Sequence, residues 1–230
     1  FGKPEDENER IKFLLKNGET GFIMEHDRNT ADHCYNVDHP EVVARREDVG
    51  LTGAVMQSVR DTAICMDGLP VDSSFGHAGG AVVQHAPFAL AAYWTVAKQR
   101  GFDLGKLPGT GQSDFNLTYL GCVTKEQIPT LPGLRFNADI IEFCDRYLPY
   151  WVPVSIAGYN AADTTAAITA VAHKANLRRL QIGTKFTVAE HGFRFSFKPD
   201  IDVYILRHPD RGWIALNAIR QVETYVAFIQ

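Results

Sequence analysis

Cysteine is scarce in this chain: only Cys34, Cys65, Cys122 and Cys144 occur among 230 residues. No two of them have the Cys-x-x-Cys spacing of a zinc ribbon or a redox pair. The spacing therefore predicts reduced thiols that act as small core hydrophobes, as is typical of intracellular proteins.

Long apolar runs and an excess of positive charge are also missing. The most apolar stretch, residues 86–97, is too short to cross a bilayer and has a proline at its second position. The net charge is -4 and the basic residues are dispersed, so we expect no nucleic-acid partner and no membrane span. No secretory or transit peptide is visible at Phe1, where the chain starts inside what reads as functional sequence.

The histidines follow no recognised metal-ligand pattern. His77 and His85 flank a glycine turn, and the segment 26–39 contains three histidines and two neighbouring aspartates, Asp27 and Asp32. Because neither spacing matches a known ligand motif, we expect no metal site.

The remaining composition is that of an ordinary globular protein, with 45% apolar and 22% charged residues. Patterns typical of strands alternate with helical patterns, and this alternation predicts parallel β-α units. The expected strands are residues 20–25, 52–57, 71–76, 109–114, 151–158 and 192–198, whereas residues 202–207 fit either a strand or a helix. The expected helices are residues 1–17, 59–67, 82–100, 134–147, 161–175 and 213–230. Six strands are two fewer than a closed (β/α)8 barrel needs.

The stretch Trp151–Asn160 has the clearest functional pattern. It is a β-branched run that ends in small residues, followed by Tyr159 and Asn160 and then by a helical segment. In a β/α barrel these two residues would lie at the carboxyl mouth of a strand, where barrel enzymes hold their catalytic groups. The alternative is that they are ordinary turn residues.

Several segments resemble one enzyme family in colinear order over about 195 residues. They are Phe1-Gly2, Glu7-Asn-Glu-Arg10, Gly18-Glu-Thr-Gly21, Tyr35-Asn-Val-Asp-His-Pro40, Asp48-Val-Gly50, Asp67-Gly-Leu-Pro70, Gly109-Thr-Gly-Gln-Ser-Asp114, Leu134-Arg135, Ala138-Asp139, Ser155-Ile-Ala-Gly-Tyr159 and Arg194-Phe-Ser-Phe197. Together they resemble the substrate-binding barrel of the methylmalonyl-CoA mutase family, the adenosylcobalamin-dependent acyl-CoA mutases. The resemblance implies an α/β fold, an incomplete (β/α)8 TIM-type barrel of about six parallel strands over residues 1–200. Residues 201–230 diverge and are expected to form a helical docking or capping element.

The resemblance also implies three substrate-binding residues. Gln112 matches a glutamine that contacts the acyl group, and Tyr159 matches a tyrosine beside the thioester. Arg135 matches an arginine that holds the substrate carboxylate, a role that suits its planar fork of donors. Arg135 could instead pair internally with Asp139 or Asp114.

The departures from the family pattern concern catalysis. Asn160 replaces the catalytic histidine, and an amide cannot deliver a proton near neutral pH as imidazole can. The third-strand exit has become Ser74-Phe-Gly-His-Ala-Gly-Gly80, and Arg28 would place a charge in the barrel mouth. A cobalt-ligand motif Asp-x-His-x-x-Gly is absent from these 230 residues. This chain alone is therefore expected to bind no cofactor, and adenosylcobalamin only if a partner supplies the binding domain.

Two functional hypotheses follow. The first is a catalytically silent, mutase-derived barrel that serves as a structural or accessory subunit of a larger assembly. The second is the barrel chain of a split acyl-CoA mutase that is completed by partner chains. Both require a protein partner over the open barrel edge, and an acyl-CoA ligand is possible in both. The resemblance implies the mitochondrial matrix in a eukaryote and the cytoplasm otherwise.

Overall fold

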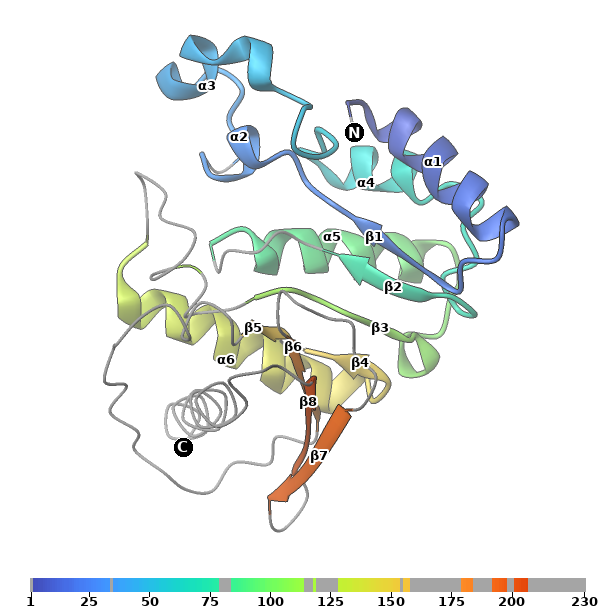
Figure 1. Ribbon diagram of the computed structural model, residues 1–230. Coiled ribbons are helices and arrows are strands. Elements are labelled where there is room, and N and C mark those ends of the chain that lie inside the picture. Colours follow the sequence, from blue (N-terminus) through green and yellow to red (C-terminus); the bar gives the residue numbers. More distant parts are fainter. Residues whose placement is uncertain are drawn as a thin grey trace. The chain divides into compact units, whose positions relative to one another are not determined.

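A computed structural model describes residues 2–33, 35–78, 84–113, 118 and 128–153, together with four later strands (Figure 1). The chain divides into two compact units. Unit 1 comprises Phe1–Gly80, Gln84–Gln112 and Tyr147–Trp151, and unit 2 comprises Ala81–Val83, Ser113–Arg146 and Val152–Gln230.

Unit 1 is built on a sheet with the strand order β1-β2-β3-β4. Its helices are α1 (Pro4–Lys16), α2 (Arg28–Ala31), α3 (Pro40–Ala44), α4 (Val59–Cys65) and α5 (Ala86–Gln99), with 3-10 turns at Arg46–Asp48 and Leu104–Lys106. The strands are β1 (Gly21–Met24), β2 (Phe75–Ala78), β3 (Gly109–Thr110) and β4 (Trp151–Val152), of which β4 reaches the unit boundary. β1 pairs with β2, and β2 with β3, in parallel. Each strand therefore lies beside the next one in sequence, as β-α units require.

Capping residues, a proline and a glycine fix the ends of the helices α1 and α4. At the start of α1, Pro4 occupies the first turn and the Lys3 backbone N–H donates to Asp6 Oδ2 at 2.9 Å. Past its end, Gly18 has a φ of +103°, a conformation that glycine adopts without steric cost. Ser58 caps α4, because its hydroxyl accepts from the Asp61 backbone N–H at 3.2 Å.

The core of unit 1 lies between the sheet and α5. A Cβ added at Gly76 would collide with Tyr93 of α5, and one added at Gly109 would collide with the ring of Trp151. The Tyr93 and Trp151 ring centroids are 5.2 Å apart, and both residues are fully buried. The opposite face of the sheet carries Ile23 and Phe75, which are 58% and 43% exposed.

Residues 52–57 do not form the expected second strand. Ala54 makes only isolated parallel bridges, to Gly2 and to His26. The chain then turns, because the Met56 backbone N–H donates to the Ala54 carbonyl at 3.0 Å. The expected third strand also begins later than predicted. Ser74 N–H bonds to the Pro70 carbonyl at 2.9 Å, so that residues 71–74 form turns and pairing starts at Phe75.

Unit 2 contains the helix α6 (Thr130–Tyr147, whose last residue belongs to unit 1) and a second sheet. The strands are β5 (Ser155–Ala157), β6 (Arg179–Gly183), β7 (Gly192–Phe197) and β8 (Ile201–Leu206), in the order β5-β6-β8-β7. The expected strand at 192–198 is found as β7, but it pairs with β8 in antiparallel fashion. Six parallel strands are therefore not confirmed. The ambiguous segment at 202–207 is largely β8, and the expected helices at 161–175 and 213–230 lie outside the described residues.

None of the helices in the described part of the chain has the length and apolar character needed to cross a membrane.

Candidate functional site

A row of side chains crosses the sheet of unit 1 on the face opposite α5. The strand register places Ile23 beside His77, and His77 beside Thr110. Glu25 and Gln112 follow Ile23 and Thr110 by two residues, and alternate residues of an extended chain share a face. The row thus continues with two polar residues past the carboxyl ends of β1 and β3, the edge at which α/β proteins bind ligands.

The protonation states along this row are set by burial. Burial and the nearby Glu7 raise the pKa of Glu25 to about 7. Burial lowers the pKa of His77 to about 4, so this imidazole is neutral at pH 7. His77 Nδ1 and Thr110 Oγ1 are buried with no hydrogen-bond partner among the described residues. The row therefore offers polar atoms that a bound ligand could satisfy.

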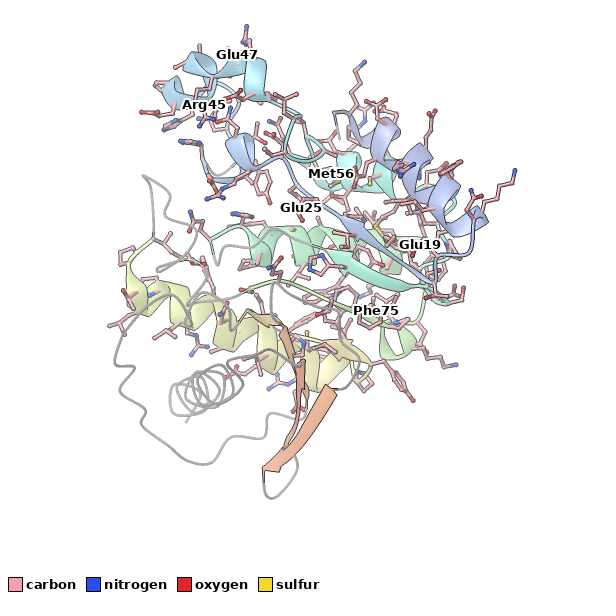
Figure 2. The ribbon with its side chains drawn as sticks, in the orientation of Figure 1. Glu19, Glu25, Arg45, Glu47, Met56 and Phe75 are labelled. Atoms are coloured by element: carbon pink, nitrogen blue, oxygen red, sulfur yellow. The ribbon has the colours of Figure 1, made fainter. Side chains whose placement is uncertain are left out.

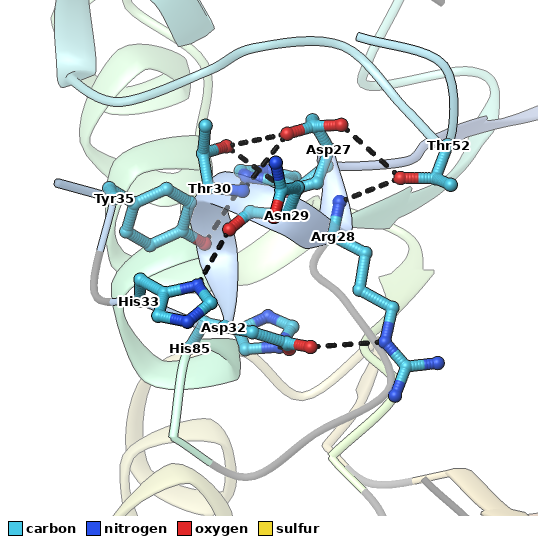
Figure 3. Close-up of polar contacts among 10 residues, drawn as sticks. Asp27, Arg28, Asn29, Thr30, Asp32, His33, Tyr35, Thr52 and His85 are labelled. Atoms are coloured by element: carbon cyan, nitrogen blue, oxygen red, sulfur yellow. Dashed lines mark hydrogen bonds and ion pairs between the residues drawn. The ribbon is translucent and has the colours of Figure 1, made fainter. Parts of the chain in front are cut away.

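Asp27 anchors the loop that follows β1 (Figure 3). Its buried carboxylate accepts from the backbone N–H and the hydroxyl of Thr30, both at 3.0 Å. The other carboxylate oxygen accepts from Gly50 N–H at 2.9 Å and from Thr52 Oγ1 at 3.2 Å. Asp27 thus accepts from four donors, two of which tie residues 50–52 to the exit of β1, and we assign Asp27 a structural role.

A second polar cluster lies beside this loop (Figure 3). Tyr35 Oη and His26 Nδ1 are 3.2 Å apart, and His85 Nε2 lies 3.4 Å from Asp32 Oδ1. Asp32 Oδ2 also accepts from Arg28 Nε at 3.1 Å. Burial, followed by the nearby His85 and His77, lowers the pKa of His26 to about 4, partly offset by its hydrogen bond to the Met56 backbone. His26 is therefore a neutral imidazole with hydrogen bonds to Tyr35 and Met56.

The Arg28 side chain pairs with a neighbouring carboxylate. Its side chain is 48% exposed and pairs with Asp32, while its backbone N–H donates to Thr52 Oγ1 at 3.0 Å. The positive charge of Arg28, which the sequence predicts at the strand mouth, is thus compensated by Asp32 four residues further along.

The predicted substrate-binding residues that the structure describes belong to different units. Gln112 is half-buried and follows β3 in unit 1. Arg135 lies on α6 in unit 2, where Arg135 Nη2 is 2.7 Å from Asp139 Oδ1. The two side chains are 59% and 49% exposed. Tyr159 and Asn160 lie outside the described residues.

Within the described segments, no three His, Cys, Asp or Glu side chains are placed to hold a metal ion.

Sequence reasoning missed Glu25 and Thr110 as site residues. The sequence predicts Glu25 only as the last residue of a strand, and Thr110 only as part of the Gly109-Thr-Gly-Gln-Ser-Asp114 motif. Counting alternate positions from the exposed Ile23 would have placed Glu25 on the same face. Thr110 could be found only from the pairing of β2 with β3.

Comparison with known proteins adds an independent finding. Residues 1–176 match the family model described as methylmalonyl-CoA mutase. The 2-hydroxyisobutanoyl-CoA mutase large subunit of Aquincola tertiaricarbonis is 31% identical over 167 residues, which are 71% of this chain and 28% of that protein. The mitochondrial methylmalonyl-CoA mutase of Homo sapiens is 31% identical over 169 residues, which are 72% of this chain and 21% of that protein. The methylmalonyl-CoA mutase of Escherichia coli (strain K12) is 31% identical over 168 residues, 72% of this chain and 22% of that protein. The chain thus spans less than a third of each relative.

Proposed function

Because this chain belongs to the methylmalonyl-CoA mutase family, we propose that it is a mutase-derived, incomplete (β/α)8 barrel without catalytic activity of its own. In this proposal it acts as a structural or accessory subunit of a larger assembly. The sequential order β1-β2-β3-β4 supports the barrel, because neighbouring strands of a β/α barrel follow one another in sequence.

The observation that carries the proposal is Asn160, which replaces the family's catalytic histidine, and the ion pair between Arg135 and Asp139 adds to it. By resemblance, Arg135 corresponds to the arginine that binds the substrate carboxylate. Here the Asp139 carboxylate of the same helix pairs with the guanidinium, with Arg135 Nη2 and Asp139 Oδ1 2.7 Å apart. An exposed pair of this kind contributes only about 0.3–0.5 kcal/mol, yet a substrate carboxylate would have to displace it. Together with asparagine at position 160, this favours a site that no longer turns over substrate.

The full sequence has no Asp-x-His-x-x-Gly motif, the pattern that the resemblance associates with the cobalt ligand of the family's cobalamin domain. We therefore propose that adenosylcobalamin is relevant only if a partner chain supplies its binding domain, and we derive no step through it.

We propose that a protein partner covers the open edge of the barrel, since exposed strand edges recruit other chains. The relatives include mitochondrial and bacterial mutases. Accordingly, we propose the mitochondrial matrix as the compartment in a eukaryote and the cytoplasm in a bacterium.

A second candidate function is the barrel chain of a split acyl-CoA mutase. The polar row on the sheet favours it, because His77 and Thr110 carry buried polar atoms without partners beside Glu25. A polar acyl group could satisfy these atoms, whereas a purely structural barrel has no use for them.

Titration of the chain with its native partners, using methylmalonyl-CoA and adenosylcobalamin, tests the two candidates. The accessory role predicts no turnover and no effect of Arg135→Ala on thioester binding. Asp139→Ala should then increase thioester binding, because it frees the guanidinium. Arg146→Ala, a basic residue on the same helix, serves as the matched control. Turnover, or micromolar binding that Arg135→Ala abolishes while Arg146→Ala does not, would establish the split mutase instead.

A further inference from the structure

The strand β1 forms one edge of the sheet in unit 1. Phe75 N–H donates to the Thr20 carbonyl at 3.1 Å, so this carbonyl points toward β2. In a parallel ladder alternate residues bond to the same neighbouring strand, so Phe22 also bonds to β2. The backbone N–H and C=O groups of Gly21 and Ile23 therefore point away from β2, toward the free side of β1.

A contact just past the end of β1 supports this direction. The carbonyl of Glu25, two residues after Ile23, accepts from Ala54 N–H at 2.8 Å, and Asp27 N–H donates to the Ala54 carbonyl at 2.8 Å. Ala54 thus forms a parallel bridge on the side of β1 that faces away from β2. Among the described residues, the backbone groups of Gly21 and Ile23 have no such partner on this side.

The sequence of β1 lacks the features that protect an exposed edge. Edge strands that stay unpaired in natural proteins carry charged residues, a proline or a β-bulge. The strand Gly21-Phe-Ile-Met24 has no charge and no proline, and its register with β2 is continuous. Its apolar residue Ile23 is 58% exposed. An uncharged edge with open N–H and C=O groups is a template for the addition of another strand.

We infer that a partner chain adds a parallel β-strand to β1 and bonds to Gly21 and Ile23 through its backbone. The direction follows from the pairs already present, because the Ala54 bridge on this side of β1 is parallel and β1 pairs with β2 in parallel. Each strand of a β/α barrel has two parallel neighbours, and β1 has one. A second copy of the chain, related by a two-fold axis, would instead present its β1 in antiparallel direction.

Ala54 also limits the length of the added strand. It occupies the side of the chain next to His26, so the partner strand pairs with β1 only as far as Met24. An apolar residue of the partner beside Ile23 buries this exposed side chain, because neighbouring residues on one face of a sheet pack together. The inference specifies the partner contact of the proposed function and rests on it.

The test compares amide hydrogen exchange in the full chain alone and in the assembly that is isolated through a tag on this chain. We expect the Ile23 amide to exchange roughly tenfold or more slowly in the assembly, because pairing converts an open N–H into a hydrogen-bonded one. The Phe22 amide is the internal control. It faces β2 in both states, so its exchange should differ little between them.

Two substitutions at one position separate the backbone contact from the side chain. Ile23→Pro removes the outward N–H and spares the bonds to β2, since proline is tolerated on the free side of an edge strand. It should release the partner, which native mass spectrometry detects, whereas Ile23→Ala keeps the N–H and should retain the partner. Circular dichroism checks the fold, and Ile23→Lys, a charge that blocks edge pairing, takes the place of a proline variant that does not fold.

Equal exchange of the Ile23 amide in both states, or a chain that purifies without any partner, would overturn the inference. A homodimer that Ile23→Pro dissociates would overturn it in favour of a second copy of the chain. Turnover by an assembly in which the Ile23 amide is protected would refute the accessory role and leave the strand contact standing.

Discussion

Replacing Glu25 by glutamine isolates the free energy that burial of one carboxyl group costs this fold. Glu25 follows β1 at the sheet edge, and its pKa rises from 4.5 to about 7 through burial and then through Glu7 (Figure 2). In the unfolded chain the group releases its proton near pH 4.5, whereas in the folded chain it holds the proton up to about pH 7. Stability therefore falls as pH rises through this window, and the full penalty is present above pH 7.

The magnitude follows from the shift. A difference of about 2.5 pH units corresponds to about 3 kcal/mol at 1.36 kcal/mol per unit. Glutamine has a similar shape and no charge to bury. Glu25→Gln should therefore stabilise the protein by up to about 3 kcal/mol at pH 8 and by almost nothing at pH 4.

Urea unfolding at pH 4 and pH 8, followed by tryptophan fluorescence, measures both values. Trp94 and Trp151 are buried in unit 1 and report its unfolding directly. Glu19→Gln, at an exposed carboxylate in the turn that precedes β1, is the matched control and should change stability little at either pH. A stabilisation of equal size at both pH values, or none at pH 8, would refute the reasoning.

Three further changes have defined outcomes in the same unfolding assay. His77→Gln should reduce the loss of stability in acid, because burial in the wild-type folded state lowers the pKa of His77 from 6.5 to about 4. Between these two pH values the slope of the unfolding free energy against pH should decrease by about 1.4 kcal/mol per pH unit. An unchanged slope would contradict the assignment. Asp27→Ala should cost about 3 kcal/mol, because it leaves buried donors of Thr30 and Gly50 unpaired; a loss under 1 kcal/mol would argue against its anchoring role. Trp151→Ala should cost about 3–5 kcal/mol by opening a cavity against Tyr93, and a smaller loss would show that the core collapses around it.

Local patterns predicted the parts of the fold that local interactions decide. The apolar periodicity and the Asn17-Gly18 stop located α1, and the run after Gly18 located β1 within one residue at each end. Trp151 does begin a strand, but the single strand predicted over residues 151–158 was wrong: it is divided into β4 (Trp151–Val152) and β5 (Ser155–Ala157), which belong to different sheets. The elements α1 and β1 each carry their boundary signal within their own sequence, as caps, glycines and buried apolar side chains.

The error at residues 52–57 has a physical cause that lies outside the segment. Its apolar residues suggested a strand, but Gly53 packs directly against the His26 backbone, and Ala54 alone of this segment takes part in β-bridges. The pairing partner of β1 is instead Phe75–Ala78, fifty residues further along. Strand pairing is a tertiary choice, and the alternation of one segment does not specify its neighbour.

For the candidate site, too, the sequence indicates which residue types are present but not which of them lie together. The sequence supplied its residue types, including the histidines and the polar exit of β1, but the register decided which of them share a face. His26 and His77 illustrate this. Both imidazoles are neutral, but buried His26 bonds to Tyr35 and Met56, while half-buried His77 lies in the row with Thr110 and keeps an unpartnered, buried Nδ1. The unpartnered atom, rather than the presence of a histidine, marks the position at which a ligand would gain a hydrogen bond. Any activity that this domain retains should therefore depend more on His77 than on His26.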